Sequence, residues 1–454
     1  MASVFCPALF VTAPASGQGK TTITAALARL LTRQGKVVRV FKTGPDYLDP
    51  QILQQASGQP VEQIDLWMAG EAWCQDKFYQ AAVVADLILI EGAMGMFDGE
   101  PSSADLAARF GVPMAIVMDV KGMAQTAAAL ACGLADFRED VEVAGIIANK
   151  CGTDRHRQLI ADALPEHIPL LASLARSEEI ALPERHLGLV QAAEVRDELE
   201  LRFEAGADWL EAAGVGDIIA NFKAVEFFPS PPPEVAPLMK NIRVGVAKDA
   251  AFTFIYESNL QLLRDMGASV EFFSPLADQA LPDVDALWFP GGYPELHTKT
   301  LSENTLLITA LKKFQQDDKP ILAECGGLLY CLESLTDLEG EQYPMAGLLG
   351  GQGAMRGKRG CQGMQTAPLP EGEVRAHAHH RSRSDNTPEP IGFGRRQRHP
   401  APGEAIYRQG KLTATYLHLF FPSNPQAIAD VFSGKASSNV AGIVDGRAQQ
   451  EDVA

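Results

Sequence analysis

The chain has 454 residues, of which 46% are hydrophobic and 21% are charged, and its formal net charge is −18. A chain of this length is expected to form two or three domains, each large enough to bury its own core. The acidic balance argues against non-specific binding of nucleic acids or anionic membranes by the whole surface, although it does not exclude a local basic site.

The first half of the chain alternates short apolar runs with helical patterns, which is typical of a doubly wound α/β sheet. The runs are almost continuously apolar, as expected for parallel strands that are buried on both faces. Strands are predicted at residues 8–12, 37–41, 86–91, 113–119, 143–149 and 168–172. A helix is predicted at residues 20–33, with Leu27, Leu30 and Leu31 on its inner face.

Five prolines in residues 224–241 mark the predicted domain boundary. Proline cannot continue a helix or a central strand, so we expect a linker here. This linker separates a first domain over residues 1–223 from a second over residues 242–440. Residues 441–454 are expected to form a frayed tail.

A strand and helix alternation restarts after the linker, so the second domain is also expected to be α/β. Strands are predicted at residues 242–248, 269–275, 286–292 and 320–327, and helices at residues 257–266 and 303–316. Residues 355–411 are rich in glycine, arginine and histidine, and their secondary-structure signal is weak.

The cysteine and hydrophobic patterns indicate a cytoplasmic protein. The seven cysteines are scattered and contain no CxxC pair, which fits a reducing cytosol and neither a disulfide framework nor a zinc site. No apolar run approaches the roughly 18 residues of a membrane-spanning helix. The apolar start lacks a basic region and runs into a glycine turn, so we interpret it as a first core strand and not as a signal peptide.

The segment TAPASGQGKTT, residues 12–22, lies between the first predicted strand and the first predicted helix. A glycine turn and a helix N-terminus present backbone N–H groups that attract phosphate. Gly19, Lys20 and Thr21 match the end of the Walker A pattern, whereas Pro14 replaces its first glycine. The predicted contacts to ATP are Ser16, Gly17, Gly19, Lys20, Thr21, Thr22 and, after a later strand, Asn149. The alternative is a glycine-rich connection with a chance lysine.

Acidic residues follow two of the predicted strands. Carboxylates at strand ends hold Mg²⁺ or its waters beside a triphosphate. The predicted Mg²⁺ ligands are Thr21, Asp46 and Glu91. Turn formation beside two prolines is the alternative for Asp46 and Asp49. Further residues singled out near this site are Lys42, Tyr47, Asp49 and Asp98.

A candidate nucleophile lies in PILAECGGLLYCL, residues 320–332. Cys325 follows an apolar strand and precedes a helical pattern, so we expect an exposed thiol whose pKa is lowered by the helix N-terminus. His418 in TATYLHLFF is the predicted base. Backbone N–H groups of Gly291, Gly292 and Gly326 are the predicted oxyanion hole. An inert buried thiol is the alternative for Cys325, and Cys331 is predicted to be a core residue.

Together these motifs resemble the cobyrinic acid a,c-diamide synthase family, whose aerobic members act on hydrogenobyrinic acid. The resemblance runs from about residue 8 to residue 435. It rests on APASGQGKTT, KTGPDYLDP, EGAMGMFDG, LPERHLGL, KDAAFTFIYESNL, FSPLAD, PGGYPE, ECGGLLY and YLHLFF. It implies an N-terminal P-loop domain of the dethiobiotin-synthetase type and a C-terminal class I glutamine amidotransferase domain with a flavodoxin-like α/β fold.

The resemblance implies a carbon–nitrogen ligase of cobalamin biosynthesis. Glutamine would be hydrolysed at Cys325 through a thioester, with His418 as base, and ammonia would pass internally to the first domain. There ATP–Mg²⁺ would phosphorylate the a and c acetate carboxylates of the corrinoid in turn, and ammonia would displace phosphate. The residues implied near the corrinoid and acyl phosphate are Asp46, Tyr47, Asp49 and Asp98. ATP, L-glutamine and a corrinoid polycarboxylate are the implied partners, without nucleic acid or membrane, and a homodimer stays open.

Several positions depart from the family pattern. Phe420 stands where many class I glutaminases carry the orienting glutamate, so we expect a Cys–His dyad. Ala378 replaces the glutamate of the family's usual RGHEFHYS, and the run before the late strand diverges. Residues 351–411 contain 11 Lys and Arg against 5 Asp and Glu. This basic segment, which includes Arg395 and Arg396, either faces the polycarboxylate or the domain interface, or consists of solvated arginines.

The acceptor is left open by the sequence. Cobalt-containing cobyrinate and cobalt-free hydrogenobyrinate both fit the motifs, and the segment after Asp98 mildly favours the cobalt-free acid. Ni-sirohydrochlorin is a third possible acceptor, which would be amidated by the same mechanism. A nucleotide switch of the ParA/MinD type with an inactive amidotransferase fold is the competing class, and the Cys325–His418 pair argues against it.

Overall fold

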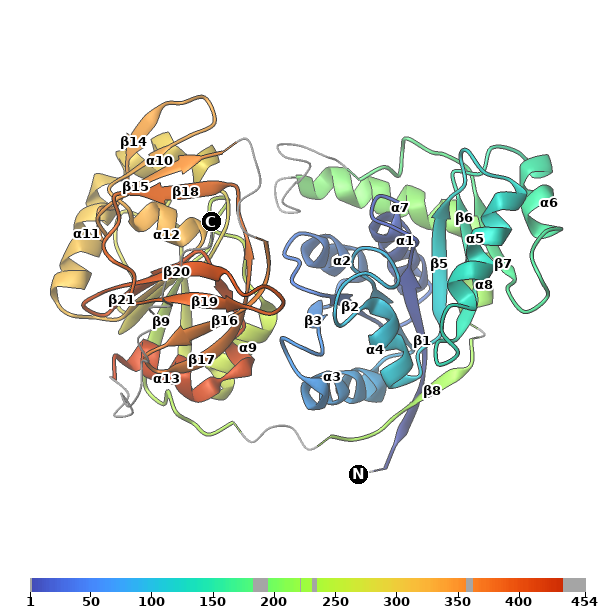
Figure 1. Cartoon of the computed structure of the whole chain (residues 1–454), viewed down its shortest axis with the longest axis horizontal. Coiled ribbons are helices and arrows are strands. Elements are labelled where there is room, and N and C mark those ends of the chain that lie inside the picture. Colours follow the sequence, from blue (N-terminus) through green and yellow to red (C-terminus); the bar gives the residue numbers. More distant parts are fainter. Residues whose placement is uncertain (1, 183–194, 221, 231–234, 357–361, 436–454) are drawn as a thin grey trace, which may run out of the picture. The chain divides into compact units, whose positions relative to one another are not determined.

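The computed structural model describes residues 2–182, 195–220, 222–230, 235–356 and 362–435, whose elements are labelled in Figure 1. The chain divides into two compact units. The first unit comprises Met1–Ala236 and Thr253–Leu262, and the second comprises Pro237–Phe252 and Leu263–Ala454. The predicted tail and the segment LPERHLGL lie wholly or mostly outside the described residues.

The first unit is built on a sheet with the strand order β3-β2-β4-β1-β5-β6-β7, in which all neighbours are parallel. Its strands are β1 (Val4–Thr12), β2 (Val38–Thr43), β3 (Glu62–Ile64), β4 (Leu87–Glu91), β5 (Met114–Asp119), β6 (Val143–Asn149), β7 (Leu170–Leu174) and β8 (Ala224–Phe227). Its helices are α1 (Lys20–Arg33), α2 (Asp49–Ser57), α3 (Glu71–Val84), α4 (Ser103–Phe110), α5 (Gln125–Ala135), α6 (Asp154–Ala161), α7 (Arg196–Ala212) and α8 (Val215–Ala220). The predicted α/β fold is confirmed.

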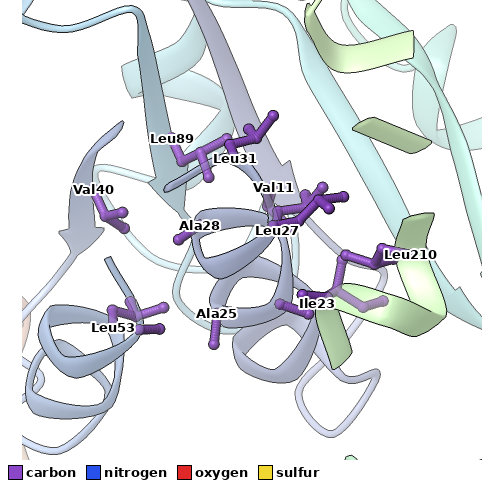
Figure 2. Close-up of a cluster of buried hydrophobic side chains, with 14 of the residues drawn as sticks. Val11, Ile23, Ala25, Leu27, Ala28, Leu31, Val40, Leu53, Leu89 and Leu210 are labelled. Carbon is purple, nitrogen blue, oxygen red and sulfur yellow. The ribbon is translucent and has the colours of Figure 1, made fainter. Parts of the chain in front are cut away.

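Successive residues of the central strand enter two different cores, because side chains alternate between the faces of a strand. Leu9 and Val11 of β1 belong to one core, and Ala8 and Phe10 belong to the other. Both faces are thus apolar, which explains the uninterrupted hydrophobic runs in the sequence. Figure 2 shows Leu27 and Leu31 of α1 against Val11 and Leu89 in the first of these cores. The predicted inner face of α1 is confirmed.

One strand of the first unit begins inside the segment expected to be a linker. β8 pairs antiparallel with residues Val4–Pro7 of β1. β8 lies before the first proline of this segment, so the prolines do not interrupt it. The number of prolines therefore did not reveal the strand.

The second unit combines parallel and antiparallel pairing in one sheet, with the order β10-β9-β11-β12-β21-β20-β19-β16-β17-β22. The strands from β10 to β21 are parallel to their neighbours, and the pairs from β21 to β22 are antiparallel. The strands of this sheet are β9 (Arg243–Ala247), β10 (Ser269–Phe273), β11 (Ala286–Phe289), β12 (Ile321–Glu324), β16 (Gln362–Leu369), β17 (Gly372–His379), β19 (Gly392–Arg396), β20 (Pro402–Gln409), β21 (Leu412–Thr415) and β22 (His418–Leu419).

The remaining elements complete this half of the chain. A smaller sheet has the order β14-β13-β15-β18. Its strands are β13 (Ser334–Thr336), β14 (Gln342–Pro344), β15 (Gln352–Met355) and β18 (Ser382–Asp385). The helices are α9 (Glu257–Asp265), η3 (Pro294–Leu296), α10 (Thr298–Glu303), α11 (Thr305–Gln316), α12 (Gly326–Cys331), η4 (Phe421–Ser423) and α13 (Pro425–Ser433).

In the segment with the weak signal, described at residues 355–356 and 362–411, lie most of the antiparallel strands of the second unit (Figure 1). β16 alternates between buried and accessible side chains along most of its length. Antiparallel strands with one accessible face carry fewer apolar residues than parallel strands buried on both faces, so their sequence signal is weaker. Within the described residues, no helix combines the length and apolar character that a membrane span requires.

Candidate active sites

The loop between β1 and α1, predicted to bind phosphate, contains two glycines with left-handed backbone angles. Gly17 has a φ of 78° and Gly19, which precedes α1, has a φ of 95°. A Cβ on Gly19 would lie 2.5 Å from Nδ2 of Asn149, and this same Nδ2 donates a hydrogen bond of 2.9 Å to the carbonyl of Gln18. Asn149 at the end of β6 therefore holds the loop after β1, and only glycine fits between them.

Lys20 is buried at the start of α1, and its ammonium crosses to the loop after β4. Its Nζ donates to the Met94 carbonyl at 2.7 Å and to the Ala15 carbonyl at 3.4 Å. Met94 has a φ of 51°, a left-handed conformation that is unusual for a residue with a side chain. Burial and the neighbouring charge of Lys42 lower the pKa of Lys20.

Thr21 of α1, Lys42 of β2 and Glu91 of β4 form a polar cluster, in which Lys42 and Glu91 are buried. Thr21 Oγ1 donates to Glu91 Oε1 at 2.8 Å, and Lys42 Nζ lies 3.7 Å from the same oxygen. Burial raises the pKa of Glu91, while Lys42 and Thr21 favour its carboxylate. Burial lowers the pKa of Lys42, but the carboxylates of Glu91, Asp49 and Asp46 outweigh it, so the net pKa is raised.

Asp46 and Asp49 combine turn formation with contacts to the cluster. Asp46 Oδ1 accepts hydrogen bonds from the backbone N–H groups of Leu48 and Asp49 at 2.9 and 3.0 Å. Lys42 Nζ lies 3.6 Å from Asp49 Oδ2 and 4.0 Å from Asp46 Oδ2. Burial and the charges of Asp46 and Glu91 raise the pKa of Asp49. The turn interpretation is thus correct for Asp46, which also contributes an oxygen to the cluster.

These side chains line a cavity of about 580 Å³ in the first unit. The cavity contains eleven residues singled out from the sequence: Ser16, Gly17, Gly19, Lys20, Thr21, Thr22, Lys42, Asp46, Asp49, Glu91 and Asn149. Tyr47 and Asp98 are not among its lining residues. Lys150, which follows Asn149 after β6, also lines it. Arg176 and Trp209 line it too and were missed, because the segments that carry them have no phosphate-binding pattern.

Tyr47 and Asp98 lie beside this cavity in other roles. The Tyr47 ring stacks on Phe254 of the same unit, with ring centroids 5.1 Å apart and planes at 18°. Asp98 is exposed, and its Oδ2 accepts the backbone N–H of Gly95 at 3.0 Å. Its charge raises the pKa of Lys20, the opposite of the effect of burial.

Thr21 and Glu91 offer oxygen ligands for a metal bound with a nucleotide. In the described parts of the chain, no three His, Cys, Asp or Glu side chains are grouped so as to hold a metal alone. Glu91 Oε2 is buried without a hydrogen-bond partner among the described residues, although Oε1 accepts from Thr21. An orphaned carboxylate oxygen beside a hydroxyl suits Mg²⁺, which also takes phosphate oxygens. Asp46 and Glu91 both approach the Lys42 ammonium, at 4.0 and 3.7 Å from Nζ.

Cys325 occupies the turn between β12 and α12 in a strained conformation, with φ 47° and ψ −101°. Its backbone N–H donates to the Thr415 carbonyl at 2.8 Å, which anchors the turn to β21. The residue is only 5% exposed, and burial raises the pKa of its thiol, whereas the Gly326 backbone N–H lowers it. The prediction of an exposed thiol with a lowered pKa is therefore wrong, because the cost of desolvating a thiolate exceeds the effect of this short helix.

His418 is the first residue of β22 and lies opposite His377 of β17. A Cβ on Gly291 would overlap the His418 ring, so the glycine loop and the imidazole are in close contact. Burial lowers the pKa of His418 well below 6.5, with further lowering by His377, His380 and His379. The imidazole is therefore neutral at physiological pH and able to accept a proton.

The three glycines of the predicted oxyanion hole are required by close approach. A Cβ on Gly326 would lie 2.9 Å from the backbone N of Gly292, and a Cβ on Gly292 would overlap the Ala251 carbonyl. None of the three has a positive φ, so the need for glycine here is steric. The loop after β11 and the turn after β12 are thus in direct contact.

Glu324 directly precedes the candidate nucleophile Cys325, and no role was predicted for it. It is fully buried, Oε1 accepts the Leu419 backbone N–H at 3.0 Å, and Oε2 accepts Trp288 Nε1 at 3.0 Å. Burial raises its pKa to about 8, although the two hydrogen bonds act to lower it. Glu324 therefore ties the strand before Cys325 to the residue after His418. A charged residue at the end of an apolar strand was the available signal.

Several arginines of the basic segment form ion pairs inside the second unit. Arg395 pairs with Glu373, and Arg408 pairs with Glu371 at 2.7 Å. Arg383 Nε lies 2.9 Å from Asp385 Oδ2. These pairs support a local structural role for the three arginines. Cys331, predicted as core, is fully buried.

Comparison with known proteins assigns both halves of the chain to families. Residues 9–190 match the CobQ/CobB/MinD/ParA nucleotide binding domain, and residues 243–426 match the CobB/CobQ-like glutamine amidotransferase domain. The fold and the two sites thus define a class, namely a P-loop nucleotide-binding domain joined to a glutamine amidotransferase domain.

Relatives match over nearly the whole chain. The hydrogenobyrinate a,c-diamide synthases of Stutzerimonas stutzeri and Pseudomonas aeruginosa are each 50% identical over 94% of this chain, which spans 99% and 98% of them. The cobyrinate a,c-diamide synthase of Herminiimonas arsenicoxydans is 45% identical over 94% of this chain and 96% of its own length. The chain belongs to the hydrogenobyrinate and cobyrinate a,c-diamide synthase family, as the motifs indicated.

Proposed function

We propose that the chain is an ATP- and glutamine-dependent amidoligase of cobalamin biosynthesis. It would amidate the a and c acetate carboxylates of a corrinoid acid. The observation that supports this most strongly is the presence on one chain of two motifs. The first is buried Lys20 and Glu91 beside Thr21, and the second is a strained Cys325 whose following glycine packs on the glycine loop that contacts His418. We assign residues 1–223 to the synthetase domain, 242–440 to the amidotransferase domain, and 441–454 to a tail.

In the second domain, Cys325 and His418 would release ammonia from glutamine. Because both groups are neutral at rest, the thiol proton passes to His418 as Sγ attacks the amide carbon. His418 then returns this proton to the departing nitrogen, which leaves as ammonia and gives a thioester. Water hydrolyses the thioester to glutamate. Backbone N–H groups at Gly291, Gly292 and Gly326 would stabilise the oxyanion.

In the first domain, the cavity would bring ATP to a substrate carboxylate. The carboxylate attacks the γ-phosphorus, ADP leaves, and ammonia displaces phosphate from the acyl phosphate to give an amide. Phosphorylation is needed because hydroxide is a poor leaving group. Lys20 and the loop N–H groups would hold the phosphates, and Asn149 would fix the loop. Lys42, Asp46, Tyr47, Asp49 and Asp98 would position the acid or its acyl phosphate.

Thr21 and Glu91 would hold Mg²⁺ with the triphosphate, and Asp46 is the third proposed contact. The metal supplies positive charge that offsets the negative charge of the phosphates. Small molecules are the proposed partners, the cytoplasm is the proposed location, and a homodimer remains an option.

The acceptor we favour is hydrogenobyrinic acid. Relatives named for this acid are 50% identical to the chain, whereas a relative named for cobyrinate is 45% identical. Both acids present the same peripheral acetates, and the cobalt-free one differs in the centre of the ring.

The test is mass spectrometry of the products formed with ATP and Mg²⁺. The full chain is given glutamine or an ammonium salt together with hydrogenobyrinate, cobyrinate or Ni-sirohydrochlorin. We expect two amides on hydrogenobyrinate with either nitrogen source. The Cys325→Ala variant should lose amidation with glutamine and keep it with ammonium. Cys331→Ala, which removes a buried thiol at the end of the helix that follows Cys325, is the control and should keep both.

Two results would reject the proposal. Failure to consume ATP with any tetrapyrrole and ammonium would rule out the ligase. If Cys325→Ala amidated as fast as wild type with glutamine, Cys325 would not be the nucleophile. Two amides on Ni-sirohydrochlorin alone would overturn the corrinoid assignment and leave the chemistry intact.

A further inference from the structure

Glu295 is a buried carboxylate close to Cys325 that the chemistry above does not use. It belongs to η3 (Pro294–Leu296), directly after the glycine loop that contacts His418. Glu295 is only 7% exposed. Its own backbone N–H provides a hydrogen bond, and across the described parts of the chain no lysine, arginine or histidine forms an ion pair with it.

Two other buried acids, by contrast, have partners supplied by other residues. Glu324 accepts hydrogen bonds from Leu419 and Trp288, and Glu91 lies beside Lys42. Burial raises the pKa of Glu295 to about 7, and one backbone hydrogen bond opposes this only in part. A buried carboxylate of this kind is unfavourable unless a cation joins it.

The position of Glu295 relative to the nucleophile is set by close packing. A Cβ on Gly326 would lie 2.9 Å from Cδ of Pro294, so η3 contacts the residue after Cys325. The charge of Glu295 is, after burial, the largest influence that raises the pKa of the Cys325 thiol. Glu295 thus lies within electrostatic range of the atom at which the glutamine amide must react.

We infer that Glu295 binds the α-ammonium group of the glutamine substrate and thereby determines specificity for it. This inference rests on the proposed glutaminase function. The ammonium is the only cation of glutamine, and a short alkyl chain separates it from the amide carbon that Cys325 attacks. Pairing it with Glu295 supplies the missing counter-charge through a charge-assisted hydrogen bond. The pairing also offsets the field that disfavours the thiolate, so binding of glutamine assists its own nucleophile.

The test combines one side-chain change with one substrate change. Glutaramate is glutamine with hydrogen in place of the α-ammonium, so it keeps the reacting amide and lacks the group in question. Ammonia release is measured for both amides with the full chain, ATP, Mg²⁺ and hydrogenobyrinate. Glu295→Gln removes the charge and keeps the size. Glu303→Gln, an exposed glutamate in the following helix α10, is the matched control.

We expect wild type and Glu303→Gln to prefer glutamine strongly over glutaramate. In Glu295→Gln, kcat/KM for glutamine should fall by about 10- to 100-fold, the range for a hydrogen bond to a charged group, and the value for glutaramate should change little. The preference should therefore collapse. Amidation with ammonium should stay at the wild-type level, which also shows that Glu295→Gln is folded.

An unchanged ratio between glutamine and glutaramate in Glu295→Gln overturns the inference, whether both rates persist or both fall together. If Glu295→Gln does not fold, the same ratio is measured with Glu295→Asp, whose shorter reach should weaken glutamine selectively. Failure of the proposed function is distinguishable, because the wild type would then release no ammonia from glutamine.

Discussion

Cys325 and His418 have opposite pKa shifts that share one cause. Burial raises the pKa of the thiol and lowers that of the imidazole, because it disfavours the charged form of each. The resting pair is therefore a thiol and a neutral imidazole. Sequence identified both residues, but their charge state depends on how deeply the fold encloses them.

The shift at His418 predicts a pH dependence of stability. The unfolded imidazole titrates near 6.5, and the folded one titrates well below this value. Below pH 6.5 the unfolded state binds more protons than the folded state, so the free energy of unfolding falls as the pH falls. Urea unfolding at about pH 7.5 and about pH 5.5 should show a smaller acid loss for His418→Gln than for wild type.

The control for this measurement is His399→Gln, which changes an exposed histidine of the same unit. It should lose as much stability as wild type between the two pH values. An equal acid loss in His418→Gln would show that His418 is not held neutral.

At the scale of elements, Glu324 joins β12 to β22 through the Leu419 backbone N–H. Glu324→Gln keeps one acceptor oxygen and turns the other into an NH₂ group, which cannot accept a hydrogen bond. We expect glutamine-dependent amidation to fall about tenfold and the free energy of unfolding to fall by about 1–3 kcal/mol. Steady-state assays with glutamine and with ammonium check this, and the ammonium rate should be unchanged.

Glu339→Gln is the control for this change, because Glu339 is exposed in the same unit. Equal losses with glutamine and with ammonium would contradict a role for Glu324 in positioning His418. Such a result would show general destabilisation.

The glycine loop after β11 offers a steric test at the same scale. In Gly291→Ala the new Cβ would overlap the His418 ring, and the backbone needs no positive φ. We expect the imidazole to shift, glutaminase activity to fall sharply, and the free energy of unfolding to fall by about 1–3 kcal/mol. Gly392→Ala, where a Cβ meets open space, should behave like wild type in both assays. Normal glutaminase activity in Gly291→Ala would place His418 elsewhere in solution.

At the scale of the whole molecule, two chemistries lie in two compact units, each with a sheet and a core of its own. In both units the polar groups follow the carboxyl ends of parallel strands, the usual place for ligands in open α/β sheets. Thr21 lies in the first turn of the helix after β1, Lys42 is the next-to-last residue of β2, Glu91 is the last residue of β4, and Cys325 follows β12. The two activities are therefore expected to be separable by mutation.

Lys20→Met tests this separation. The variant keeps an alkyl chain of similar length and loses the charge that we propose to face the phosphates, so ATP consumption should be lost with glutamine and with ammonium alike. Alkylation of Cys325 by a glutamine analogue should persist at the wild-type rate. The control is Lys36→Met, an exposed lysine after the same helix. Retained ATP consumption in Lys20→Met would contradict the proposed phosphate site.

Most parallel strands and α1 were predictable, because their apolar runs and helical spacing arise from local burial. The three-residue strand β3 was not predicted. The antiparallel strands from β16 to β20 were not predicted either, because they have one accessible face and carry few apolar residues. Tyr47 and Asp98 were predicted from motifs, but the motifs do not predict their contacts, namely the ring of Phe254 and the backbone N–H of Gly95.

By itself, the sequence determined the family, the order of the two α/β domains, and the phosphate-loop and cysteine motifs, because these depend on residue type at short spacing. The tertiary structure alone decided which of these side chains are buried, which acids have partners, and that Glu295 lies close to Cys325 without a counter-charge. Charge state and contact depend on residues brought together from distant parts of the chain, and no local pattern encodes that proximity.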